Sequence, residues 1–317
     1  MKKYLYSILL VLLLATPAMA AEEFGVYVKA IEKAEGSFEQ TVKSLETGLT
    51  EAGFEVLASY GSGVDKRCGQ RAHVVVVNNN DYSDRIMSHG ATSAFALPLR
   101  VGIYEDSSGI NIAFVNPSSI NRTILGDEVE TDLSASTAKK LNEAITSSVK
   151  GTNVDTQIGQ IRDKGYVGGM GGGKFHKKVA TFHEGGALSD TIDAARKSAG
   201  ENDKGWKLVY SIEPADGVTL MGMTKSETEA KAFDIAGDSR ESRKEPCPGL
   251  DHAAAFPIEV LVYAEEGQAR MVSMDEMYRM KVYFEDAGNW AFMKNMTMPG
   301  NIQDELKDVL TSGLKKK

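Results

Sequence analysis

Cysteine, proline and positive charge are scarce in this 317-residue sequence, which has two cysteines, eight prolines and a formal net charge of −8. Acidic residues outnumber basic ones by 44 to 36, and no basic cluster stands out, so nucleic acid is excluded as the natural partner. Cys-x-x-Cys and Gly-x-Ser-x-Gly motifs are missing, and the five histidines have no close ligand spacing. These absences argue against thioredoxin-like exchange, an α/β-hydrolase serine and a structural zinc site, and we expect no cofactor.

Long apolar runs are also missing after the first 20 residues, where none approaches the roughly 18 residues that span a bilayer. We therefore expect no stable membrane span. The first 20 residues have the pattern of a secretory signal peptide, because Lys2 and Lys3 precede an apolar run and the small residues Ala18 and Ala20 precede the cleavage site. The sequence predicts cleavage after Ala20 and a periplasmic or secreted protein.

Two stretches of the chain contain similar sequence segments in the same order. The number of residues between matched segments grows along the chain, as expected if the second copy has small loop insertions. Each match begins with a glycine and an amphipathic helix, continues with a glycine that ends the helix before a strand, and reaches an Ala-x-Pro strand followed by an acidic turn. Each copy also closes with an amphipathic helix. The matched segments are Gly36–Val42 with Gly186–Ile192, Gly53–Leu57 with Gly205–Val209, and Ala96–Tyr104 with Ala255–Tyr263.

This duplication predicts a signal peptide at 1–20, a first domain at 24–150, a linker at 151–177 and a second domain at 178–313. Short turns join most strands, so we expect antiparallel sheets and the α+β class, with two similar β-α-β(antiparallel sheet)-α domains that each have their own core. Glycines crowd the linker and indicate flexibility. Gly168–Lys174 fits G-x-x-x-x-G-K, but Phe175 occupies the Mg²⁺-binding hydroxyl position, so a linker is favoured over a phosphate loop.

The segment from Leu97 to Asp106, running on to Phe114–Pro117, resembles the domain-of-unknown-function family numbered 302, and Ser37–Val42 through Gly53–Val56 is similar to that family's opening helix and strand. The resemblance implies a compact unit of the TATA-box-binding-protein-like fold, often dimeric, with no established activity. A tandem pair could form such a dimer within one chain, and a homodimer of the whole chain stays open. Many members carry cysteines that are absent here, so their thiol chemistry is not carried over.

The two cysteines, Cys68 and Cys247, fall in different copies of the repeat and at positions that do not correspond. An isolated pair in an oxidising compartment is expected to form a disulfide, which would clamp the two domains together. The alternatives are two separate thiols or one redox-active thiol at Cys68. The positive charges of Lys66, Arg67 and Arg71 would lower the pKa of that thiol.

Methionine is frequent late in the chain and recurs at steps of three. Thioethers are soft ligands that suit Cu(I), which makes these residues candidates for a copper site. The alternative is that they fill irregular space in the core, and the repeat predicts a strand and hairpin where the run begins. The candidate ligands are Met271, Met274, Met277 and Met280.

These patterns favour an exported protein that binds a small ligand or a periplasmic protein and has no catalysis of its own. No catalytic residue is predicted. We expect the binding surface in a cleft between the two domains. The alternative is a periplasmic redox or copper-handling protein that uses Cys68 and Cys247 or the methionines.

Overall fold

The computed structural model describes residues 24–126, 129–162, 164–237 and 249–314. The predicted signal peptide and the cleavage position after Ala20 lie outside the described residues. Within the described part of the chain, no helix combines the length and the apolar character that crossing a membrane would need.

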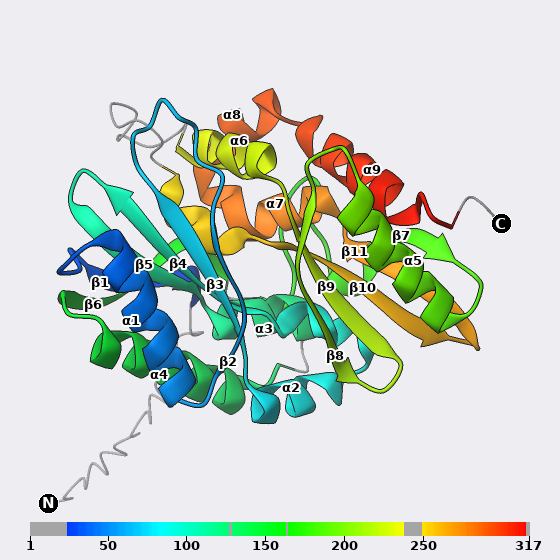
Figure 1. Cartoon of the computed structure of the whole chain (residues 1–317), viewed down its shortest axis with the longest axis horizontal. Coiled ribbons are helices and arrows are strands. Elements are labelled where there is room, and N and C mark those ends of the chain that lie inside the picture. The colour runs from blue at the N-terminus through cyan, green and yellow to red at the C-terminus, as the bar shows by residue number, and fades with distance from the viewer. Residues whose placement is uncertain (1–23, 127–128, 163, 238–248, 315–317) are drawn as a thin grey trace, which may run out of the picture.

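The first half folds as an antiparallel sheet with helices packed on it (Figure 1). Its strand order is β2-β3-β4-β5-β1-β6, and every neighbouring pair is antiparallel. The elements are β1 (Phe24–Glu32), α1 (Phe38–Glu51), β2 (Glu55–Gly61), β3 (Ala72–Asn78), α2 (Asn80–Met87), the 3₁₀ helix η1 (Ala91–Ala96), β4 (Leu99–Asp106), β5 (Gly109–Val115), α3 (Pro117–Leu125), α4 (Thr131–Ser148) and β6 (Thr152–Arg162).

The second half repeats this order of elements and the corresponding order of strands, β7-β11-β10-β9-β8. Among the described elements, β6, α8 and the short 3₁₀ helices η3 and η5 have no counterpart in the other half. The α+β class with antiparallel sheets is therefore confirmed. The elements are the 3₁₀ helix η3 (Phe175–Lys177), β7 (Val179–Glu184), α5 (Leu188–Glu201), β8 (Lys207–Ala215), β9 (Val218–Thr224), α6 (Ser226–Gly237), η4 (Leu250–Ala255), β10 (Ile258–Glu265), β11 (Gln268–Met274), α7 (Glu276–Phe284), η5 (Glu285–Ala287), α8 (Gly288–Lys294) and α9 (Met298–Thr311).

Helix α1 shows how the sequence sets these boundaries. Ser37 caps its first turn, where the Ser37 hydroxyl accepts a hydrogen bond from the Gln40 N–H and the Gln40 side chain accepts one from the Ser37 N–H. Leu45 and Leu49 are fully buried on the face toward the sheet. Gly53 then takes a φ of +82° and turns the chain into β2, and Gly205 takes the same φ after α5.

The predicted linker at 151–177 differs from the structure. Its first part, Thr152–Arg162, is strand β6, which pairs with β1 along its whole length and completes the first sheet. The glycines that indicated a linker lie only in the second part, where a bridge between Val167 and Gly173 closes a loop. Phe175 then anchors the chain, because its buried ring packs against Phe95 and Tyr278 from the two halves.

The two halves share one continuous apolar core, in contrast to the expected pair of separate cores. The contact is reciprocal, because η4 of the second half packs on β4 and β5 and η1 of the first half packs on β10. Gly102 in β4 permits a close approach, since a Cβ at this position would lie 3.0 Å from the backbone nitrogen of Ala254. The halves therefore pack against each other through elements that hold the same place in the order of each half.

Candidate binding groove

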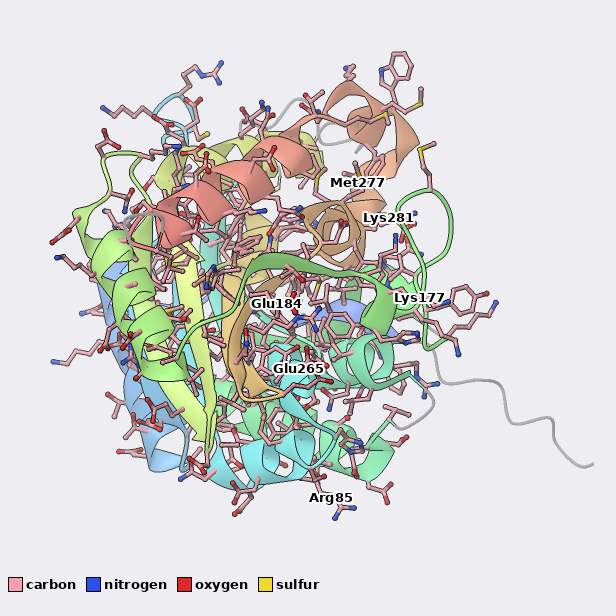
Figure 2. All side chains as sticks on the ribbon, turned by 90° about the vertical axis from the view of Figure 1, so that its right-hand side faces the viewer. Arg85, Lys177, Glu184, Glu265, Met277 and Lys281 are labelled. Atoms are coloured by element: carbon pink, nitrogen blue, oxygen red, sulfur yellow. The ribbon has the colours of Figure 1, made fainter. Side chains whose placement is uncertain are left out.

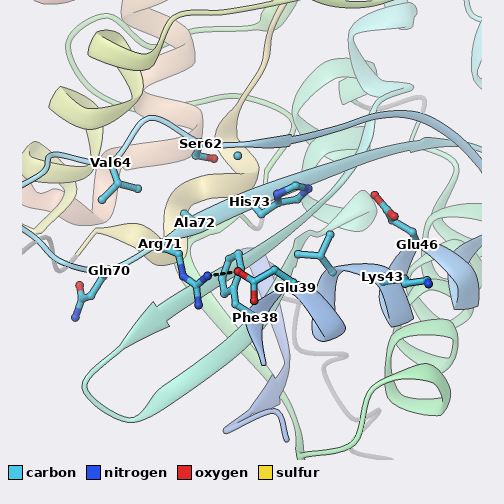
Figure 3. A pocket seen from close by; sticks show the side chains of 12 residues that line it. Phe38, Glu39, Lys43, Glu46, Ser62, Val64, Gln70, Arg71, Ala72 and His73 are labelled. Carbon is cyan, nitrogen blue, oxygen red and sulfur yellow. Dashed lines mark hydrogen bonds and ion pairs between the residues drawn. The ribbon is translucent and has the colours of Figure 1, made fainter. Parts of the chain in front are cut away.

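A groove on the outer side of the first half lies between α1 and the loop 62–71 that joins β2 to β3 (Figure 3). Its volume is about 720 Å³, within the roughly 300–1,000 Å³ of small-molecule sites. Apolar side chains make the floor and polar ones make the rim. The floor comprises Phe38, Val42, Val64 and Ala72, and the rim comprises Glu39, Lys43, Glu46, Ser62, Gln70, Arg71 and His73.

One end of the groove is closed by a neutralised arginine. Arg71 donates two hydrogen bonds of 3.0 Å to the carboxylate of Glu105 and a third to Glu39, and its guanidinium lies 4.4 Å from the ring centre of Phe38. The hydrogen bonds to Glu105 raise the pKa of Arg71, and the pKa of Glu39 is lowered by its own backbone N–H and by Arg71. The positive charge of Arg71 is therefore more than balanced by two carboxylates at this end.

The other end carries Lys43, Glu46 and His73. Burial lowers the pKa of His73 despite the opposing field of Glu46, so its imidazole is neutral near pH 7. The Lys43 ammonium forms no ion pair with any residue that the structure describes. Lys43 is thus a positive charge beside an apolar floor, with Glu46 on the same rim but with no ion pair to any described residue.

His73 also hydrogen-bonds Ser59, with 2.7 Å between the imidazole Nε2 and the serine Oγ. A serine nucleophile needs such a base, and the base in turn needs a group that orients its second nitrogen. Among the described residues no carboxylate hydrogen-bonds that second nitrogen of His73, and Ser59 lies on the exposed edge strand β2. The pair therefore lacks the third member of a catalytic triad.

The second half has a smaller groove at the equivalent place, between α5 and the turn that joins β8 to β9. Its volume is about 300 Å³, and Leu188 and Ile192 take the places of Phe38 and Val42. The difference comes from the connection, which is a ten-residue loop at 62–71 in the first half and the short Asp216-Gly217 turn in the second. The longer loop therefore builds the larger groove.

The loop 62–71 is held from the second half. The backbone N–H of Gly63 donates to the carboxylate of Glu229 on α6, and Arg67 lies 3.7 Å from Asp234 on the same helix. A Cβ at Gly63 would come within 2.1 Å of the Ser226 carbonyl oxygen, so only glycine fits there. Burial raises the pKa of Glu229 to about 7.

Cys68 lies on this same loop and is buried, at 8% exposed. No free cysteine occurs among the described residues. Cys247 lies outside the described residues, so the disulfide between the two stays a prediction. Such a bond would add a covalent tie between loop 62–71 and the second half.

The expected cleft between the halves is filled where β4 meets β10. Arg100 and Glu259 occupy matching positions in β4 and β10 and form an ion pair of 2.7 Å between the two halves, with 1% and 4% of their side chains exposed. Arg100 also donates to the Pro257 carbonyl at 3.2 Å and to the hydroxyl of Tyr283. The buried Arg100–Glu259 ion pair therefore fills the place between the halves where the sequence predicted a binding cleft. The groove described above lies on the outer side of the first half.

A second buried charge lies near this contact. Both ring nitrogens of His252 face carboxylates, with 2.8 Å from Nδ1 to Asp251 and 2.9 Å from Nε2 to Asp286. Donating to both requires the doubly protonated ring. Burial alone would lower the pKa of His252, but the two carboxylates outweigh burial and raise this pKa to about 9. The ring stacks on Phe284, and Tyr27 meets it edge-on.

The methionine candidates are divided between two elements. Met271 and Met274 lie in β11, where residues three apart point to opposite faces of the sheet. Met277 and Met280 lie on α7. Met271, Met274 and Met280 are buried in the core. The copper site remains untested, and among the described residues no group of three or more His, Cys, Asp and Glu could hold a metal ion.

The fold defines a two-part α+β protein with a groove on the outer side of its first half. Residues 30–148 match the family described as "Domain of unknown function DUF302", so the first half contains a DUF302-like domain. One solved structure, described as an uncharacterized conserved DUF302 protein from Bacillus stearothermophilus, is 17% identical and covers 39% of this chain and 98% of its own, with a TM-score of 0.32. No curated protein matches the chain.

Sequence patterns did not point to the groove. None of its lining residues was a predicted site residue. The one signal available was the length of the β2–β3 connection, which exceeds its counterpart in the second copy by several residues. Loops that exceed the length of their counterparts are frequent sites of function.

Proposed function

We propose that this is an exported, non-catalytic binding protein that holds a small organic molecule with an apolar body and an acidic head in the groove between α1 and loop 62–71. The observation that carries the proposal is the charge of Lys43, which forms no ion pair within the described residues, beside the apolar floor formed by Phe38, Val42 and Val64. An apolar floor with a few placed polar groups is the usual composition of a ligand site.

The sign of the head group follows from the rim. Arg71 is held by Glu39 and Glu105, whereas Lys43 and Glu46 both stand on the rim without an ion pair among the described residues; Lys43 is the cation to which an acidic ligand head would bind. The hydroxyl of Ser62, on the loop side, is buried and has no hydrogen-bond partner within the described residues. Buried polar groups nearly always have a hydrogen-bond partner. An acidic ligand head would supply such a partner to the Ser62 hydroxyl and a counter-charge to Lys43.

Export rests on the signal-peptide pattern and on the isolated cysteine pair, and the protein is proposed to work in the periplasm or outside the cell. The second half is proposed to be a diverged copy of the DUF302-like domain, on the strength of the repeated order of elements. Its role would be to hold loop 62–71 through Glu229 and Asp234.

The amphipathic anion anilinonaphthalene sulfonate is a direct probe of the groove, because its fluorescence rises in apolar surroundings. We expect saturable binding to the mature protein. Val42→Trp should abolish it by filling the floor, and Lys43→Glu should weaken it by about tenfold, or about 1.4 kcal/mol. A fluorescence titration measures each affinity.

Two controls keep this test specific. Val64→Trp fills the groove from the loop and should act like Val42→Trp, so a defect in α1 alone cannot explain both. Lys139→Glu makes the same charge change at an exposed position on α4 and should leave the affinity unchanged. Binding that persists in both tryptophan variants would show that the probe sits elsewhere and would remove the support for the groove.

A further inference from the structure

Glu229 on α6 is a buried carboxyl at the junction between the groove and the second half. Acidic side chains usually lie at the surface, as those of Glu184 and Glu265 do at the ends of β7 and β10 (Figure 2). Only 1% of Glu229 is exposed, and it forms no ion pair with any residue in the described ranges. Its carboxylate would therefore lose its water without gaining a cation in direct contact.

Two groups donate hydrogen bonds to this carboxyl, and one of them belongs to the groove. The hydroxyl of Thr224 on β9 donates to Oε1 at 2.5 Å, and the backbone N–H of Gly63 in loop 62–71 donates to Oε2. Ser62 and Val64, on either side of Gly63, line the groove (Figure 3). Glu229 therefore holds the wall of the groove from behind.

Few other contacts fix the start of this loop. Among residues 62–71 only Cys68 is buried, and within the described chain no backbone–backbone hydrogen bond joins residues 64–70 to another element. The contact of Arg67 with Asp234, at 3.7 Å, is exposed and contributes little. Cys68 follows Gly63 by five residues, so a bond at Cys68 would leave Gly63 able to move away from α6.

Burial and hydrogen bonding act on Glu229 in opposite directions. Burial favours the protonated acid, whereas the hydrogen bonds from Gly63 and Thr224 and the field of Lys207 on β8 favour the carboxylate. Burial outweighs them, so the pKa of Glu229 rises from 4.5 to about 7.

The other ionisable groups around Glu229 are neutral or already paired. Burial and the charge of Glu229 raise the pKa of Tyr60 on β2 well above 10, so its hydroxyl stays neutral. Lys225, just before α6, lies 2.6 Å from Glu305 on α9. The remaining pairs are Asp65 with Arg67 on the loop, Arg67 with Asp234 on α6, and Arg100 with Glu259 beyond Tyr60.

We propose that Glu229 is a pH-sensitive latch on loop 62–71, which keeps the loop closed when the carboxyl is protonated and releases it when the carboxyl is ionised. An open loop exposes Glu229 to water, where its pKa returns to the ordinary 4.5. Because the closed loop binds the proton more tightly, a rise in pH from 4.5 to 7 favours opening. The pKa difference corresponds to about 300-fold in the opening equilibrium, of which about 40-fold falls between pH 5 and 7.

The latch would regulate the groove. A ligand that contacts Ser62 and Val64 needs the closed loop, so the groove would hold it at mildly acidic pH and release it as the pH approaches neutrality. This consequence rests on the proposed function, whereas the opening of the loop does not.

Hydrogen exchange of the Gly63 amide, followed by NMR, measures opening without any ligand. We expect the protection factor of this amide to fall by about 40-fold from pH 5 to pH 7. Glu229→Gln keeps an acceptor for the Gly63 N–H and gains a donor for Thr224, as the protonated acid does, and should be equally protected at both pH values. Glu227→Gln removes a charge at a position that is 87% exposed on the same helix and should behave like the wild type.

A wild-type protection factor that is the same at both pH values, or a fall that persists in Glu229→Gln, would overturn the latch. The dissociation rate of anilinonaphthalene sulfonate, measured by stopped flow, tests the effect on the groove separately. It should rise from pH 5 to pH 7 in the wild type and stay constant in Glu229→Gln, and a constant rate in the wild type would overturn the link to binding. If the probe does not bind in the groove while the Gly63 protection still follows pH, the proposed ligand fails and the latch stands.

Discussion

Glu259→Gln is expected to lower the free energy of unfolding by about 3–5 kcal/mol, because it leaves Arg100 buried with no carboxylate to balance it. Burial disfavours the charged form of Arg100, but the fields of Glu259, Tyr283 and Tyr210 together outweigh burial and raise the arginine pKa. A guanidinium keeps its proton in proteins, so the variant cannot escape the cost by deprotonation. The remaining hydrogen-bond partners of Arg100 are the carbonyls of Ala255 and Pro257 and the Tyr283 hydroxyl. Urea unfolding followed by circular dichroism measures the loss.

The repeat makes a sharper version of this experiment available. Since Arg100 and Glu259 face each other as a buried ion pair between the two halves, Glu259→Arg should be worse than Glu259→Gln, and adding Arg100→Glu should recover most of the stability. The exposed Lys139–Glu143 pair, 3.8 Å apart on α4, is the control, and exchanging its charges should cost less than about 1 kcal/mol. If the losses of unfolding free energy in the two single variants simply add in the double variant, the Arg100–Glu259 pair does not stabilise the contact between the halves.

Stability should also fall in alkaline solution because of His252. Its folded-state pKa of about 9 lies above the ordinary value of 6.5, so the protonated ring stabilises the fold in full below pH 6.5, and this contribution is lost as the pH rises through about 9. The difference corresponds to about 3 kcal/mol. Urea midpoints measured between neutral and alkaline pH should therefore decline.

A variant isolates His252 from the other groups that titrate in this range. His252→Gln removes the imidazolium and should flatten the decline, while starting from lower stability at neutral pH. His183→Gln is the control, because this half-buried histidine contacts only the Gly185 carbonyl in the described structure and should leave the pH dependence as it is. An unchanged slope in His252→Gln would assign the alkaline loss to other groups.

Local signals predicted the regular part of the fold well. The capping residues around Ser37, the glycines at 53 and 205, and the matched strands near Pro98 and Pro257 all depend on neighbours in sequence, and the α+β order follows from them. Strand β6 was missed because it is an edge strand with few buried side chains, and such a strand has a weak alternation of apolar residues.

The sites were harder to predict because they depend on which segments meet in space. The sequence aligned Arg100 with Glu259, yet only the packing of β4 against β10 makes them partners. Asp286, one of the two groups that hold the proton on His252, is far from it in sequence. The groove depends on the position of loop 62–71 relative to α1. The spacing of apolar residues in the sequence does not predict where a loop lies.

The measurement that most directly tests the central claim, a small acidic ligand in the groove, is native mass spectrometry of the protein isolated from the periplasm or the medium, the locations proposed for it. The account predicts a small organic adduct on the wild-type protein that is absent from Val42→Trp and retained in Lys139→Glu. A wild-type protein with no adduct, or an adduct retained in Val42→Trp, would contradict it.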